Sequence, residues 1–275
     1  MTAILIQGVY HACFGLSYLV ALLLELGRIA RPATATAWRA TGLAFGIAGL
    51  AAHTFYILVH RPDPATPSGS LLLLSWVLAF FYLYGTWHHA KQAWAVFVLP
   101  VVILLVALSY ALFHGDNPGV PAWASGERFW GAIHGTLILL ATVGVSVAFL
   151  ASVMYLVQAR RLRKKLNPVK VIPLLSLEKL ENMNRKAVNW AFPLLTAGLL
   201  VGTLLLRHYH GLGDNWLSPK ILSTAGLWLV FLVLMYLRYG TSVAARRLAW
   251  FSIVAFGLML VALGTAHPFA TGGTQ

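Results

Sequence analysis

The apolar residues of this chain fall into eight long segments separated by polar connections. Each segment approaches the roughly 20 residues that a helix needs to cross about 30 Å of hydrocarbon at 1.5 Å per residue. The pattern predicts an all-α, polytopic integral membrane helix bundle with both termini on one side. The expected spans are Ile4–Leu26, Arg39–His60, Ser70–His89, Trp94–His114, Phe129–Val157, Ala187–Leu206, Pro219–Arg238 and Leu248–Ala266.

Lysine and arginine residues orient these segments. Sixteen of the 20 basic residues fall in alternate connections, and the other four are Arg61, Arg128, Arg207 and Lys220. The positive-inside rule makes the basic face cytoplasmic and predicts that both termini lie outside. Membrane insertion alone accounts for a formal charge of +13 that is confined to one face, so we expect no nucleic-acid partner.

Composition indicates one membrane domain over residues 1–275. Hydrophobic residues make up 59% of the chain and charged residues 10%, against about 25% charged in soluble domains. We expect four spans in 1–114, an outer loop at 115–128 and four spans in 129–275. The expected location is a bacterial inner membrane, crossed several times. The first segment lacks the basic start of a cleavable signal, so we expect it to remain as a span.

The inner connection at 158–186 is strongly basic. Ser176 is the expected N-cap of a helix that has Glu178 in its first turn. Leu177, Leu180 and Met183 repeat every three residues, which predicts a short amphipathic helix along the inner membrane surface. Elsewhere, the spacing of Gly42, Gly46 and Gly49, and of Gly198 and Gly202, is typical of closely packed membrane helices.

The histidines are the candidate chemistry. Eight of the 10 fall in the outer half of the predicted topology, and His11 and His53 lie furthest from the end of a span. Acidic residues are scarce, and no zinc-protease, nucleophile-elbow, P-loop or dinucleotide motif occurs. Neutral imidazoles among aromatic residues suit haem, whose iron two histidines can ligate axially. Cys13 is the only cysteine, so the chain has no Cys-x-x-Cys-His attachment sequence and is not itself a c-type cytochrome.

Two stretches carry a family resemblance, Trp130-Gly-Ala-Ile-His134 and Leu263-Gly-Thr-Ala-His267. They resemble spans of the cytochrome c assembly family, the CcsA, CcmC and HemX-like membrane proteins. The resemblance implies that His134 and His267 are the axial ligands of haem b, bound or transient, at the outer face. It also implies a cofactor-binding set, of which the remaining members are Trp123, Trp130, Trp216 and His53.

The chain departs from the family pattern in two places. The tryptophan-rich loop is reduced to Gly213-Asp-Asn-Trp-Leu-Ser-Pro-Lys220, and Tyr236 stands where full synthases have an in-membrane histidine. These departures favour the HemX-like branch.

The resemblance implies a function in cytochrome c biogenesis. The protein would hold haem at the outer face and present it to apocytochrome c, together with another membrane protein of cytochrome c assembly. This is the role of an assembly factor and not of a stand-alone enzyme. Two alternatives remain open. One is a HemX-like regulatory or assembly subunit that acts on tetrapyrrole synthesis through its basic inner connection. The other is a b-type electron-transfer subunit, in which His11 would be the mate of His53.

Overall fold

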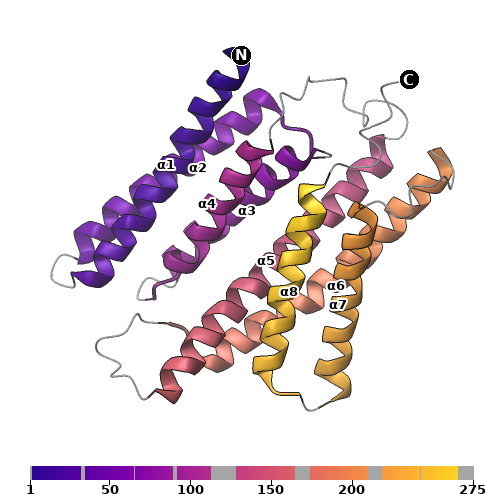
Figure 1. The fold of residues 1–275 in the computed structure, drawn as a ribbon. Helices are drawn as coiled ribbons and strands as arrows, with labels where there is room; N and C mark the ends of the chain where they lie inside the picture. Colours follow the sequence, from indigo (N-terminus) through magenta and orange to yellow (C-terminus); the bar gives the residue numbers. More distant parts are fainter. Residues whose placement is uncertain are drawn as a thin grey trace. The chain divides into compact units, whose positions relative to one another are not determined.

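The computed structural model describes residues 2–31, 35–64, 66–88, 92–112, 128–164, 174–209, 219–241 and 243–265. Side chains are described within these ranges from residue 11 onward, except at 128, 129, 206, 208, 209 and 220. This part of the chain forms eight α-helices and no strand (Figure 1). They are α1 (Thr2–Ala30), α2 (Ala35–His60), α3 (Pro67–His88), α4 (Ala95–Ala111), α5 (Arg128–Arg163), α6 (Leu177–Tyr209), α7 (Pro219–Gly240) and α8 (Ala245–Gly264).

The predicted fold class is confirmed. Seven of the helices in the described residues are long and apolar enough to cross a membrane, and α4 is a shorter apolar helix of 17 residues. Many large apolar side chains on these helices are exposed, among them Leu58, Leu200 and Leu204. Exposure of this kind is expected where a helix faces lipid instead of water. The protein is therefore a multi-pass membrane protein.

The helices divide into two compact units, one with α1 to α4 and the other with α5 to α8. In the N-terminal unit α1 packs against α2 and α4. Two glycines of α2 admit aromatic rings. A β-carbon on Gly46 would stand 2.6 Å from Tyr82 Oη, and one on Gly49 would stand 3.0 Å from the Tyr18 ring. The close packing predicted from the glycine spacing on this helix is confirmed.

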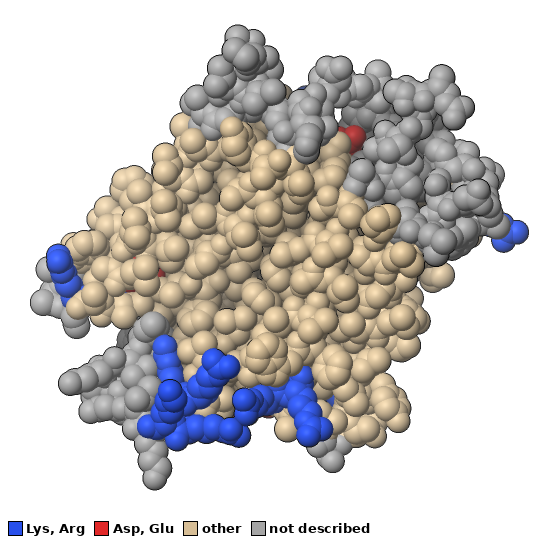
Figure 2. Space-filling view, in the orientation of Figure 1, with Lys and Arg blue, Asp and Glu red and all other residues tan. Residues whose placement is uncertain are grey.

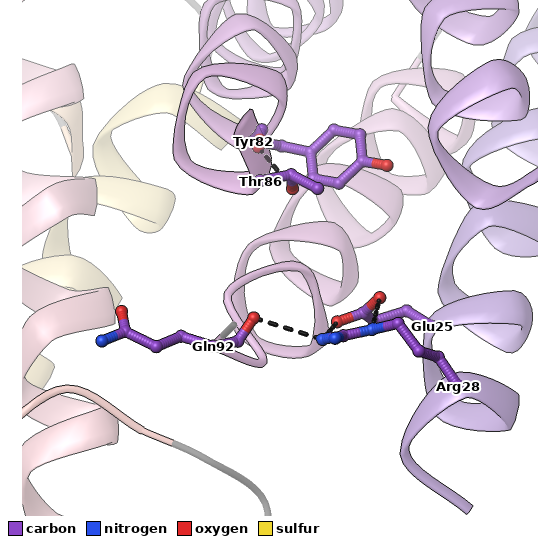
Figure 3. Close-up of polar contacts among 5 residues, drawn as sticks. All are labelled: Glu25, Arg28, Tyr82, Thr86 and Gln92. Carbon is purple, nitrogen blue, oxygen red and sulfur yellow. Dashed lines mark hydrogen bonds and ion pairs between the residues drawn. The ribbon is translucent and has the colours of Figure 1, made fainter. Parts of the chain in front are cut away.

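A buried ion pair ties α1 to the segment before α4 (Figure 3). Arg28 donates from Nε to Glu25 Oε2 at 2.8 Å and from Nη2 to Glu25 Oε1 at 2.5 Å. The same Nη2 donates to the backbone oxygen of Gln92 at 3.3 Å. A carboxylate inside a span is stable only when it is paired, and Glu25 is almost fully buried beside its arginine.

In the C-terminal unit α6 differs from the expectation. Ser176 is its N-cap, since Ser176 Oγ accepts from the Lys179 amide at 3.4 Å, and Glu178 lies in the first turn as predicted. The expected short helix along the inner surface is wrong, because α6 runs unbroken for 33 residues into the span. Leu180 is fully buried within the protein. Leu180 therefore packs against the protein, although the repeat had predicted that its face of the helix contacts lipid.

Asn184 of α6 joins all four helices of this unit. Its Nδ2 lies within hydrogen-bonding distance of the Ala148 backbone oxygen on α5 at 3.0 Å and of Ser152 Oγ at 2.9 Å. It also lies 2.9 Å from Ser252 Oγ on α8. Arg238 Nη2 of α7 donates to Asn184 Oδ1 at 2.5 Å. A buried polar group that is satisfied in this way fixes the register of the helices that it joins.

Basic residues of the C-terminal unit lie where α5 and α7 end and α6 and α8 begin. They include Arg161, Lys179, Arg185, Arg238, Arg246 and Arg247. In Figure 2 most of the blue atoms lie along the lower edge of the drawn face, and most of the other described surface is neither acidic nor basic. This is the end that the positive-inside rule predicts to be cytoplasmic.

Candidate functional site

His134 lies in the second turn of α5, and its imidazole packs against α6. Its Nδ1 is 2.8 Å from the backbone oxygen of Gly198. A carbonyl oxygen only accepts hydrogen bonds, so Nδ1 is the nitrogen that carries the proton. In the neutral ring the lone pair is then on Nε2, which is the atom that ligates a metal when Nδ1 is tied to a backbone carbonyl. The hydrogen bond therefore sets the tautomer of the His134 ring.

The space for this ring comes from Gly202 of α6. A β-carbon on Gly202 would stand 2.7 Å from Cε1 and 2.9 Å from Nδ1 of His134. One turn earlier, a β-carbon on Gly198 would stand 2.7 Å from Cδ1 of Ile138. The G-x-x-x-G spacing permits close helix packing as predicted, and it also seats the histidine. We call this arrangement of His134, Gly198 and Gly202 the histidine seat.

Trp130 lies one helical turn before His134 on the same side of α5. Its side chain is about half exposed, at 52%. An exposed tryptophan beside a ligand can cover part of a porphyrin, and it is also typical of the membrane interface. Its position is compatible with the predicted cofactor-binding role.

Three of the predicted site residues, His267, Trp123 and Trp216, lie outside the described residues. Helix α8 ends at Gly264 and is followed by Thr265. Ligation by His267 and coverage by the two tryptophans remain predictions.

His53 occupies a different environment, in the N-terminal unit. It is fully buried, and its ring stacks on Phe14 with centroids 4.3 Å apart and an interplanar angle of 3°. Tyr18 Oη lies 3.4 Å from its Nδ1. Its Nε2 has no hydrogen-bond partner among the described residues. Sequence reasoning singled out His53 but missed Phe14 and Tyr18, which follow His11 on α1 at helical spacings of three and seven.

Phe14 also contacts His11, with ring centroids 5.3 Å apart. The phenyl ring therefore packs against both histidines of the alternative pair. Ligation of one haem by His11 and His53, as in the b-type electron-transfer alternative, stays a prediction.

Comparison with known proteins identifies the family of the chain. Residues 65–266 match the model of the cytochrome c assembly protein family. The chain belongs to this family. It is similar to the cytochrome c biogenesis protein CcsA of Guillardia theta, with 25% identity over 207 residues, 68% of this chain and 67% of the relative. No solved structure matches.

The matched residues of this cytochrome c assembly protein begin just before α3 and include the histidine seat. His11 and His53 precede the match. The predicted HemX-like branch is not supported, since the relative found is a CcsA protein.

Proposed function

We propose that this protein binds haem b at its outer face through His134 and His267 and presents it for attachment to apocytochrome c. The observation that carries the proposal is the hydrogen bond from His134 Nδ1 to the Gly198 oxygen, which leaves the lone pair of the ring on Nε2. Membership of the cytochrome c assembly family supports the same role. We infer a bacterial inner membrane as the location.

In this proposal haem is cargo, and the protein holds it without catalysing the thioether bond. His134 holds the iron from one side, and His267 is the expected ligand on the other. Trp123, Trp130 and Trp216 would shield the porphyrin from water. The acceptor is an apocytochrome thiol pair, brought by a second membrane protein of the assembly system.

Haem content of the purified protein tests the proposal. The full-length chain would be purified in detergent and its absorbance spectrum recorded beside those of His134→Ala, His267→Ala, the double variant and His53→Ala. We expect each single variant to hold less haem, and the double variant to hold none at a normal protein level. Full haem content in the double variant, or haem lost only with His53→Ala, would reject it. A wild-type protein without haem would favour the regulatory alternative.

A further inference from the structure

The C-terminal unit has a small pocket beside the Asn184 junction, away from the histidine seat along α6. Its lining includes Tyr155 of α5, Glu181 and Asn184 of α6, Arg238 of α7 and Ala245 of α8. The pocket holds about 10 Å³, which is room for one water-sized group such as a single oxygen atom.

Arg238 leaves part of its guanidinium unsatisfied in this place. Its Nη2 donates to Asn184, whereas its buried Nη1 has no hydrogen-bond partner among the described residues. Glu181 lines the same pocket but makes no ion pair with Arg238 in the described structure. A buried charged donor without an acceptor is costly in free energy. We therefore expect Arg238 Nη1 to donate to an oxygen atom from outside the chain.

The depth of the pocket identifies the source of that oxygen. Arg238 lies two residues before the end of α7. Exposed aromatic side chains surround this level, with Trp190 at 71%, Tyr236 at 67% and Tyr239 at 61%. Tryptophan and tyrosine gather where lipid headgroups meet hydrocarbon, so the pocket lies at headgroup level. The basic residues at this end make it the predicted cytoplasmic leaflet, where anionic lipids are found.

We infer that the pocket between α5, α6, α7 and α8 binds one phosphate oxygen of an anionic lipid headgroup, with Arg238 Nη1 as the donor. Arginine suits this task because its guanidinium stays charged and keeps several donors in a fixed plane. Its Nη2 donates to Asn184 Oδ1, and its Nη1 would donate to the phosphate of the lipid. The inference does not depend on haem binding, and the experiment that follows measures lipid alone.

The test is calorimetric titration of the full-length, delipidated protein in detergent. The titrants are short-chain phosphatidylglycerol, short-chain phosphatidylcholine and inorganic phosphate. We expect saturable binding of phosphatidylglycerol and much weaker binding of the other two. Arg238→Gln should weaken phosphatidylglycerol binding by about tenfold or more, as expected when a charge-assisted hydrogen bond is lost. Arg247→Gln removes the same charge from an exposed position that does not line the pocket, and it should bind as the wild type does.

A second variant tests the inference independently, in case Arg238→Gln does not fold. Glu181→Gln leaves the Arg238–Asn184 bond intact and removes the negative charge at the pocket, so it should bind phosphatidylglycerol more tightly than the wild type. Equal binding by Arg238→Gln and wild type would overturn the inference, as would a Glu181→Gln variant that binds more weakly. Inorganic phosphate that binds as tightly as phosphatidylglycerol would assign the pocket to a soluble anion and overturn the lipid as its source.

Discussion

His134 of α5 and Gly202 of α6 are so close that the histidine ring occupies the place of a side chain at position 202. A β-carbon there would stand 2.7 Å from Cε1 of the imidazole, closer than real β-carbons approach their neighbours. The same ring is bonded through Nδ1 to the oxygen of Gly198. The absence of a side chain at 202 thus makes room for the ring, and the backbone oxygen of Gly198 orients it.

We predict that Gly202→Ala weakens haem binding. The new methyl group would push the ring away from the Gly198 oxygen and remove the bond that fixes its tautomer. Loss of such an orienting partner costs about 10-fold to 100-fold in metal affinity. Haem titration of the detergent-purified protein measures the change. Gly135→Ala is the matched control, since a β-carbon there meets nothing within 4 Å although it adjoins His134. Equal losses in both variants would contradict the role of the seat.

The Asn184 junction should contribute to stability and not to haem chemistry. Asn184→Ala removes the acceptor of Arg238 Nη2 and the polar link between α5, α6 and α8. We expect a loss of about 1–3 kcal/mol in the free energy of unfolding, as for other buried hydrogen-bonding groups. Unfolding in detergent micelles measures this loss. Asn182→Ala, which removes only an exposed bond to Arg185, should cost far less. An Asn184 variant as stable as Asn182→Ala would show that the junction is dispensable.

Topology is a separate prediction, based on the alternation of basic connections. Reporter tags at the N terminus, at Asp116 and at the C terminus should report the outer side. Tags near Arg31, Lys165 or Arg246 should report the cytoplasm. The prediction rests on the excess of lysine and arginine in cytoplasmic connections. A C terminus found in the cytoplasm would reverse every depth assigned to the histidines.

The basic segment from Arg160 to Lys165 should be separable from haem binding. Neutralising its charges should impair membrane insertion or contact with a cytoplasmic partner, because these charges help to hold that end at the anionic inner surface. The haem spectrum of the protein that does insert should stay unchanged. Haem lost at normal protein levels would contradict this separation of roles.

The sequence predicted the helices well because long apolar segments leave few alternatives in a membrane. It did not predict how far α6 extends, because the Leu177, Leu180 and Met183 repeat fits a surface helix as well as a buried first turn. Leu180 is buried because α6 packs against its neighbours, and this contact cannot be recognised in one segment.

Only part of the candidate site could be predicted from the sequence. The position of His134 near one end of a span and the G-x-x-x-G spacing were both visible in the sequence. The contact between His134 and these glycines could not be predicted, because it depends on the register between α5 and α6. The link between Asn184 and Arg238, 54 residues apart, depends on tertiary packing in the same way.

The central claim is that His134 is an axial ligand, and electron paramagnetic resonance of the ferric haem tests it most directly. The wild type should show a six-coordinate, low-spin signal from two imidazoles. His134→Ala should show high-spin haem, and added imidazole should restore the low-spin signal by entering the space that the side chain leaves. His53→Ala should match the wild type. A His134→Ala protein with full haem content and an unchanged low-spin signal would contradict the account.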